Sequence, residues 1–156
     1  MRVAGIAVRI ASSGRPAVRI IVADDASGSP VISDPQEITS DHADLPEQLH
    51  DAAESVRSRL KALIVERVVV RRADRPTKAS NKEGPRVRLI MEGAVTSAAR
   101  SEVIDTRLGT GKDTGAWYGG DKATVDAEAD RLLTEANVSS TKYLEATSAA
   151  LAALRL

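Results

Sequence analysis

Alternating apolar and polar residues in the first forty positions predict β-strands, whose successive side chains point to opposite faces. The ranges 2–10 and 17–23 are largely apolar and β-branched, with Ser, Gly and Pro residues between them, which is typical of a hairpin. The alternation in the second strand predicts that it is half-buried. A third strand is expected over 31–38, and Pro35 within it favours an edge of the sheet.

The period then lengthens to that of a helix. Pro46 and Glu47 follow Asp44, an arrangement favoured in the first turn of a helix. Apolar residues recur every three or four positions from there to Leu63, so one stripe of this helix faces the core. The all-valine stretch 68–70 is typical of a short strand that is buried on both faces in a parallel pairing.

The second half of the chain predicts further helices and one more strand. A helix is expected after Pro85, and because glycine costs about 1 kcal/mol in a helix interior, Gly93 predicts a close approach to the sheet. Residues 102–108 predict a fifth strand, and the glycines between 109 and 120 predict a loop. Two more helices are expected, one beginning at Asp121 and one at about Ser140.

This order of elements favours an α/β fold with a mixed five-stranded sheet and helices on both faces. Right-handed crossovers allow the fourth strand to lie beside the first, which gives the strand order 3-2-1-4-5. This expected order resembles the ribonuclease H-like arrangement. At 156 residues, we expect a single domain over 1–156 whose core needs no disulfide or metal.

Composition narrows the class of function. The 22 basic residues equal the 22 acidic ones, so nucleic-acid binding must depend on a local cluster. Cysteine is absent, which excludes disulfides, thiolate metal sites and cysteine nucleophiles. No apolar run approaches the ~20 residues that span a bilayer, and no signal peptide is evident, so we expect a cytoplasmic protein without membrane contact. Aromatic residues make up 2% of the chain, too few for a base-stacking surface.

Four stretches of the second half carry a resemblance to a known family: VVVRR at 68–72, RVRLIMEGAV at 86–95, GGDKATV at 119–125 and EATSAALA at 145–152. On these stretches, residues 66–156 resemble the Holliday-junction resolvases of the RuvC type, within the ribonuclease H-like superfamily. The resemblance implies a sheet that faces DNA on one side. It also implies a cluster of catalytic carboxylates.

Most of those carboxylates are missing. The family's aspartate in the first strand falls near Ala7, its glutamate after the fourth strand on Arg71, and its two terminal aspartates on Glu145 and Ser148. Residues 1–23 contain four arginines and no acid, so a shifted alignment does not restore the first aspartate. Hydrolysis by two metals needs several carboxylates to hold the cations about 3.5–4 Å apart. We therefore expect no catalytic residue, no metal and no cofactor.

A basic segment is the strongest functional candidate. Seven arginines and lysines lie within residues 71–88, and phosphate contacts from such side chains give affinity without sequence specificity. The alternative is a solvated loop, partly neutralised by Asp74 and Glu83. The residues predicted to contact nucleic acid are Arg71, Arg72, Arg75, Lys78, Lys82, Arg86 and Lys122.

Other patterns give weaker candidates. Trp117 and Tyr118 stand among glycines, where they either contact a ligand or partner from a loop or cover the edge of the core. Residues 109–112 lack the earlier glycine and the Ser or Thr of a phosphate loop. The aspartates before residue 42 do not have the spacing of a calcium loop, and a zinc site that uses His42 and His50 stays open.

Three hypotheses result. The leading one is a non-catalytic protein, or a component of an assembly, that binds DNA or RNA through the basic segment. The second is a homo-oligomer or protein-interaction module without nucleic acid, with the alanine-rich residues 146–153 as a helix–helix interface. The third is a metal-dependent junction or structure-specific nuclease with a non-standard site made from Glu66, Asp74, Glu92, Asp105 and Glu145.

Overall fold

The computed structural model describes residues 1–25, 27–75 and 82–156. Lys78 of the predicted basic segment lies outside the described residues. The elements in chain order are β1 (Arg2–Ile10), β2 (Pro16–Asp24), β3 (Val31–Ile38), α1 (Leu45–Leu63), β4 (Arg67–Arg71), α2 (Glu83–Glu102), β5 (Thr106–Gly109), α3 (Gly111–Tyr118), α4 (Lys122–Glu135) and α5 (Ser140–Arg155).

The five strands form one mixed sheet in the order β3-β2-β1-β4-β5. β1 and β2 pair antiparallel, as do β2 and β3, whereas β4 lies parallel to both β1 and β5. The predicted fold class and strand order are therefore confirmed. β3 is an edge strand, as Pro35 indicated, and 68–70 is fully buried between two parallel neighbours.

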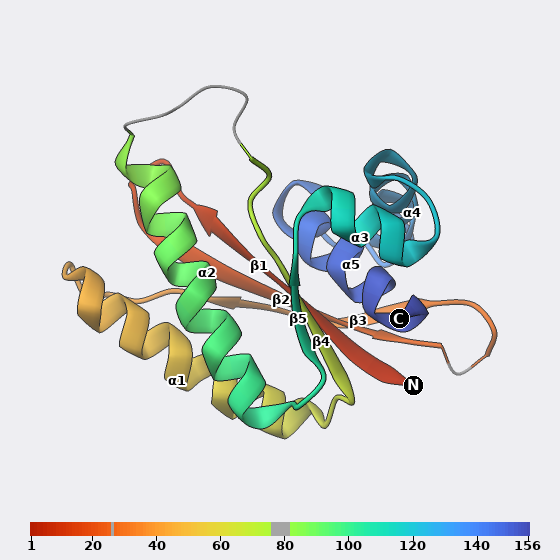
Figure 1. The fold of residues 1–156 in the computed structure, drawn as a ribbon, viewed down its shortest axis with the longest axis horizontal. Helices are drawn as coiled ribbons and strands as arrows, with labels where there is room; N and C mark the ends of the chain where they lie inside the picture. Colours follow the sequence, from red (N-terminus) through yellow and green to blue (C-terminus); the bar gives the residue numbers. More distant parts are fainter. Residues whose placement is uncertain (26, 76–81) are drawn as a thin grey trace.

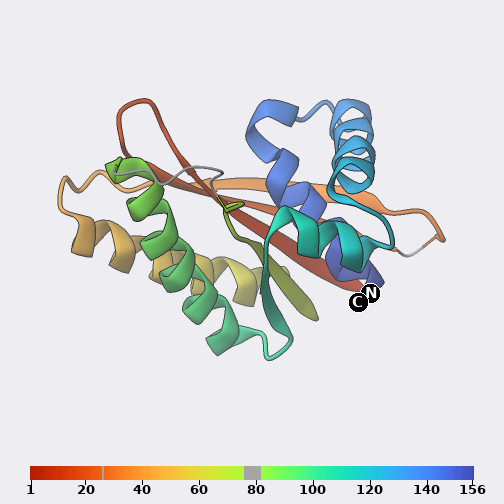
Figure 2. The ribbon, with the colours of Figure 1, turned by 45° about the horizontal axis from the view of Figure 1, so that its top comes forward.

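Helices cover both faces of the sheet (Figures 1 and 2). α1 and α2 pack on one face, against alternate side chains of β1 such as Ile6 and Val8. α4 and α5 pack on the other face, where Ala7 and Val69 point. Because the strands are covered on both sides, even β2 is buried on both faces. Ile20 faces α1 and α2, while Ile21 faces α4 and α5. The prediction of a half-buried second strand was wrong.

The close approach between helix and sheet lies at Gly5, not at Gly93. A Cβ atom on Gly5 would lie 1.9 Å from the carbonyl oxygen of Ala146 in α5. Gly93 is exposed, and a Cβ atom there would meet nothing within 4 Å. The close packing at Gly5 explains why α5 is rich in alanine, since its small residues lie on the sheet. Ala146, Ala149, Ala150, Ala152 and Ala153 are all fully buried, so they are not the surface interface that the second hypothesis used.

Two element boundaries differ from the sequence-based expectation. α2 continues to Glu102, so β5 is only the short strand Thr106–Gly109. The glycine-rich segment is not a loop, because residues Gly111–Tyr118 form α3. Thr110 caps α3: its hydroxyl accepts from the backbone N–H of Asp113, whose carboxylate accepts in return from the backbone N–H of Thr110. Within the described residues, no helix is both long and apolar enough to cross a membrane.

Candidate nucleic-acid interface

The parallel strands β1 and β4 bring Ala7 and Arg71 side by side at one end of the sheet, where they are register partners. Glu145 belongs to the same region, because its neighbour Ala146 packs on Gly5 of β1. The family resemblance assigned three of the four catalytic acids to these positions, and of the three only Glu145 keeps a carboxylate. The structure brings the positions to one end of the sheet and fills that end with ion pairs.

Arg71 occupies the centre of this end, and its side chain is only 1% exposed. Its two terminal nitrogens donate to the two carboxylate oxygens of Asp74, at 3.1 Å each, and one of them also donates to the carbonyl oxygen of Arg72 at 2.6 Å. Asp74 in turn accepts from the backbone N–H of Gly111 at 2.8 Å. The hydrogen bond from Arg71 holds the pKa of Asp74 below its usual range, and the N–H of Gly111 and the charge of Lys122 act in the same direction.

A second ion-pair group joins helices on opposite faces of the sheet. Arg88 of α2 donates through Nε to Glu92 and through a terminal nitrogen to Glu145 of α5, at 2.8 Å each. Glu92 is 2% exposed and also accepts from the backbone N–H of Ala73 at 2.8 Å. Burial opposes the charge of Arg88, but the two carboxylates outweigh it and raise the pKa of the guanidinium above its usual value.

The fourth aligned position, Ser148, is also engaged in a polar contact. Its hydroxyl donates to a carboxylate oxygen of Asp126 at 2.7 Å, and the other oxygen of Asp126 pairs with Lys122. Lys122, one of the residues predicted to contact nucleic acid, therefore lies at this end of the sheet and has a carboxylate partner. Neighbouring α4 and α5 are tied together by the contact between Ser148 and Asp126.

This arrangement does not fit a pair of divalent cations. Ala7 offers no ligand atom, and Arg71 places a positive charge beside it. The nearby carboxylates of Asp74, Glu92 and Glu145 already accept hydrogen bonds from arginines. Each potential ligand is thus neutralised by a cation that belongs to the protein.

Glu66 and Asp105, the two remaining candidate acids, do not lie near Asp74, Glu92 and Glu145. They lie at the opposite end of the sheet, where β1 and β4 begin. Glu66 accepts from the backbone N–H of Arg2, and Asp105 pairs with Arg67 at 2.5 Å. In 1–25, 27–75 and 82–156, no group of three or more His, Asp and Glu side chains is arranged to hold a metal ion.

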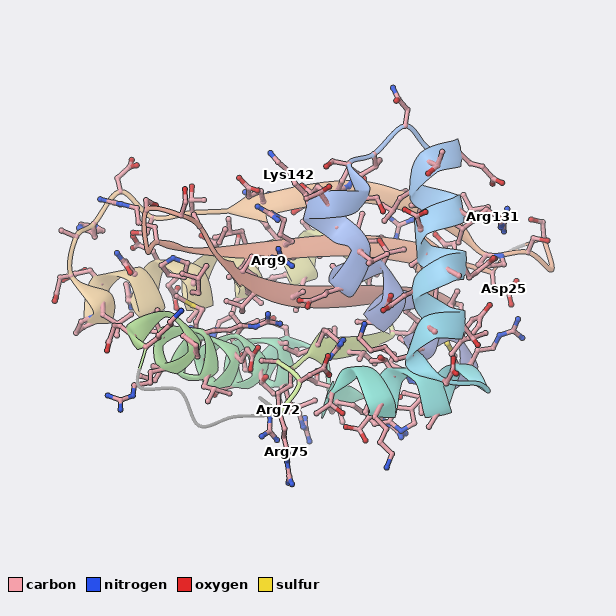
Figure 3. All side chains as sticks on the ribbon, turned by 90° about the horizontal axis from the view of Figure 1, so that it is seen from above. Arg9, Asp25, Arg72, Arg75, Arg131 and Lys142 are labelled. Carbon is pink, nitrogen blue, oxygen red and sulfur yellow. The ribbon has the colours of Figure 1, made fainter. Side chains whose placement is uncertain are left out.

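The surface beside the buried ion pairs opens into a groove of about 920 Å³, which we call the basic groove. It is bounded by the segment after β4 and by the first turns of α3 and α4. Its basic lining residues are Arg72, Arg75, Lys112 and Lys122. The side chains of Arg72, Arg75 and Lys112 form no hydrogen bond or ion pair with any described residue, and Arg72 and Arg75 extend outward from the fold (Figure 3).

The acidic residues of the basic groove are occupied by local contacts. Asp113 caps α3, and Asp121 caps α4 by accepting from the backbone N–H of Thr124 at 2.8 Å. Asp74 is held by Arg71 and Gly111. The three carboxylates are therefore used within the fold, while the side chains of Arg72, Arg75 and Lys112 make no hydrogen bond or ion pair with the described residues.

A second, adjoining groove of about 630 Å³ extends the basic surface toward β1 and α2. It shares Arg72 and Arg75 with the basic groove and adds Arg9 and Arg86, which are exposed and unpaired within the described residues. Lys82 is exposed nearby.

The predicted contact set is thus only partly at the surface. Arg72, Arg75, Lys82, Arg86 and Lys122 are at least partly exposed at the same end of the sheet, whereas the side chain of Arg71 is 1% exposed. The prediction of Arg71 as a surface contact is therefore corrected: its guanidinium is buried and bound to Asp74, so no outside group reaches it while Asp74 stays in place.

Sequence reasoning missed Arg9 and Lys112. Both follow from the topology, because the carboxyl ends of the parallel strands β1, β4 and β5 meet at one edge, where α/β folds place ligands. Arg9 is near the end of β1, and Lys112 comes three residues after β5. A search for basic residues at the end of each predicted parallel strand or just after it finds both.

The aromatic residues are part of the core boundary. Trp117 lies on α3 and packs on Gly109, where a Cβ atom would lie 2.5 Å from its ring. Tyr118 contacts the same core, and the guanidinium of Arg155 lies 5.9 Å from its ring centre. Of the two alternatives left open by the sequence, the packing supports coverage of the core edge. A glycine-flanked loop is excluded by α3.

The histidines lie away from the basic groove. His42 is 3.6 Å from a carboxylate oxygen of Asp51, and His50 lines the same shallow surface hollow. Among the early aspartates, Asp24 and Asp34 both pair with Arg2. These contacts stabilise the turns and the start of β1.

Comparison with solved structures finds proteins with a similar fold. RuvC from Thermus thermophilus aligns over 99% of this chain and 94% of its own, with a TM-score of 0.66 and 13% identity. The T. thermophilus RuvC structure in complex with Holliday junction substrate aligns with the same TM-score and identity, over 99% and 93% of the two chains. The yeast mitochondrial Holliday junction resolvase aligns over 98% of this chain and 77% of its own, with a TM-score of 0.63 and 12% identity.

Sequence comparison adds no relative. No family model matches the sequence, and no curated protein matches it. The likeness to the solved structures is therefore one of fold, and it agrees with the resemblance noted on 66–156. This chain has the RuvC-like form of the ribonuclease H-like fold.

Proposed function

We propose that this chain binds the phosphate backbone of DNA or RNA at the basic groove and does not cleave it. One observation carries the proposal: cations without an ion pair among the described residues, Arg72, Arg75 and Lys112, line a groove at the end of β4, where arginine–carboxylate pairs stand in place of a free carboxylate cluster. The T. thermophilus RuvC structure with Holliday junction substrate supports nucleic acid as the partner, because that protein shares the fold.

The chemistry of the groove favours contacts to phosphate over contacts to bases. Its exposed donors are guanidinium and ammonium groups, which bind phosphate oxygens and release counterions. Trp117, the one indole of the chain, packs on Gly109 at the core edge. Binding should therefore be insensitive to sequence and should weaken steeply as salt is added.

Fluorescence anisotropy with labelled junction, duplex and single-stranded DNA and with RNA, at a series of salt concentrations, tests this proposal. We expect Arg72→Gln/Arg75→Gln to reduce affinity about tenfold at low salt and to lower the slope of log Kd against log salt by about two. The matched control is Lys61→Gln/Arg100→Gln, which removes two charges near the ends of α1 and α2, away from the groove. No binding by the wild type at low salt, or equal losses in the two double variants, would overturn the proposal.

The non-catalytic part of the proposal has its own test. Because Asp74, Glu92 and Glu145 are paired with arginines, we expect millimolar Mg²⁺ or Mn²⁺ to leave Tm where an equal ionic strength of NaCl leaves it. We also expect no cleavage of junction DNA with either cation. Cleavage that is lost in Glu145→Gln would establish the nuclease alternative instead.

We also propose that the protein acts in the cytoplasm as part of a nucleic-acid-related assembly. There it would associate with copies of itself or with a protein partner. Leu89 and Ile90 of α2 are about half exposed beside Arg86 and Arg88, which favours an interaction surface next to the basic one. Light scattering on the purified chain measures the oligomeric state. A monomer at all concentrations would remove self-association and leave only the protein partner.

A further inference from the structure

Asp74 occupies a position that has the chemistry of a phosphate site. Its carboxylate receives two parallel bonds from the guanidinium fork of Arg71, at 3.1 Å each, and a third at 2.8 Å from the backbone N–H of Gly111. Gly111 is the first residue of α3. A guanidinium fork and an N–H at a helix start are the two groups that proteins use most readily for phosphate oxygens.

The donors of this site are buried, whereas the acceptor is half exposed. Arg71 is 1% exposed and lies on β4, and its Nε has no hydrogen-bond partner among the described residues. Asp74 is 49% exposed, and it lies in a segment that is neither helix nor strand. A buried guanidinium that loses its partner is costly, so an anion must be present at all times. Asp74 is the anion that the chain itself provides.

Close packing shows that the site is built around these donors. A Cβ atom on Gly111 would lie 2.3 Å from a terminal nitrogen of Arg71 and 2.7 Å from the side chain of Lys122. A side chain at this position would force at least one of these two cationic side chains to move away from the first N–H of α3. The charges of Arg71 and Lys122, together with the hydrogen bond from Arg71, also lower the pKa of Asp74.

The site opens onto the basic groove, whose lining includes Asp74 together with Arg72, Arg75 and Lys112. A phosphate group that enters the groove therefore meets Arg72, Arg75 and Lys112 first, and Asp74 at the groove wall covers the donors of Arg71 and Gly111. The phosphate oxygens match the geometry of the carboxylate that they would replace, and Asp74 is free to turn into solvent.

We propose that Asp74 is an internal stand-in for phosphate, and that a backbone phosphate of bound nucleic acid displaces it from Arg71 and the N–H of Gly111. This inference rests on the proposed function, because it assigns one phosphate of the bound strand to a particular set of donors. The exchange breaks and forms only hydrogen bonds. Asp74 thereby weakens binding by competing for the site.

Asp74→Asn tests the inference in the anisotropy assay. An amide removes the competing charge, so we expect affinity for nucleic acid to rise about fivefold and the slope of log Kd against log salt to steepen by about one. Glu83→Gln is the matched control, since it removes one negative charge from the same region without touching Arg71 or Gly111, and we expect a change of less than about twofold from it. Equal gains in the two variants would overturn the inference.

The amide resonance of Gly111 gives a second readout, in the wild-type protein. We expect it to shift when an oligonucleotide is added at constant chloride, because its N–H exchanges a carboxylate for a phosphate. If the amide resonances of Lys112 and Arg75 shift and that of Gly111 does not, nucleic acid binds the groove while Asp74 stays in place. That result would overturn the inference and leave the proposed function intact.

Inorganic phosphate and a mononucleoside monophosphate serve as further probes and separate the sources of the phosphate. If either probe raises the Tm of Asp74→Asn while no nucleic acid binds to any variant, Arg71 and Gly111 do bind phosphate and the proposed function fails. If neither the probes nor nucleic acid affects Asp74→Asn, both proposals fail.

Discussion

Gly5 lies where α5 crosses β1, and its missing side chain sets how closely the helix approaches the sheet. A Cβ atom there would lie 1.9 Å from the carbonyl oxygen of Ala146 and 2.4 Å from the backbone nitrogen of Ala150. Both atoms belong to the backbone of α5, so no side-chain rotation relieves the clash. The same helix carries Glu145 and Ser148, so this contact also helps to position these two side chains at the end of the sheet where the ion pairs lie.

We therefore expect Gly5→Ala to lower the free energy of unfolding by about 3 kcal/mol, near the upper end for overpacked cores. Gly93→Ala is the control, since Gly93 is exposed on α2 with open space around it, and we expect it to stabilise the fold by about 0.5–1 kcal/mol. Urea unfolding at constant m-value measures both. A Gly5→Ala variant as stable as the wild type would show that α5 is not fixed at this distance.

At the scale of elements, α3 shows where sequence reasoning succeeds and fails. Strands and long helices follow from hydrophobic period, and the order 3-2-1-4-5 follows from their sequence with right-handed crossovers. α3 does not follow, because Gly111 and Gly115 were read as loop residues. Both are needed for packing: a Cβ atom on Gly115 would lie 2.3 Å from the backbone of Asp121.

The candidate site was predictable to the same limited extent. Residue spacing located the basic segment, but burial is a tertiary property, so the sequence did not reveal that Arg71 faces inward to Asp74. It also did not reveal that Arg88 reaches from α2 to Glu145, since those residues are 57 positions apart. The missing acids at Ala7 and Arg71, by contrast, were visible from the alignment and meet in the register of β1 and β4.

The cap of α3 gives a prediction that depends on pH. The backbone N–H and the hydroxyl of Thr110 lower the pKa of Asp113, so its folded pKa lies below its unfolded value near 3.9. A lowered folded pKa stabilises the fold above about pH 4, and the contribution disappears as pH falls through the folded pKa. We expect Asp113→Asn to cost about 1 kcal/mol at pH 7 and progressively less below about pH 4.

Thermal unfolding from pH 7 to pH 3 measures that difference. Asp41→Asn is the control, because Asp41 is exposed and forms no hydrogen bond or ion pair with any described residue. Its difference from wild type should stay near zero throughout. An Asp113→Asn penalty that is the same at pH 7 and pH 3 would contradict the role assigned to the carboxylate.

At the scale of the whole molecule, the two helical layers lie on opposite faces of the sheet and are connected at one of its ends. Arg88 makes such a connection by holding Glu92 on its own helix and Glu145 on α5. The contact from Glu92 to the backbone of Ala73 adds the segment after β4 to the same network. The segment after β4 is thus connected to both layers by a network whose central carboxylate, Glu92, is 2% exposed.

Loss of Arg88 alone should lower the free energy of unfolding, and a second substitution at Glu92 should restore part of it. Arg88→Met retains the apolar stem but leaves Glu92 buried beside only one N–H, so we expect a loss of about 3 kcal/mol in the free energy of unfolding. Arg88→Met/Glu92→Gln removes the uncompensated charge and should be more stable than the single variant, while Glu145→Gln, which is less buried, should cost about 1 kcal/mol. Urea unfolding of the three variants provides the comparison. If the double variant is less stable than Arg88→Met, the buried charge is not the source of the loss, and the network is held by the packing of α2 rather than by its ion pairs.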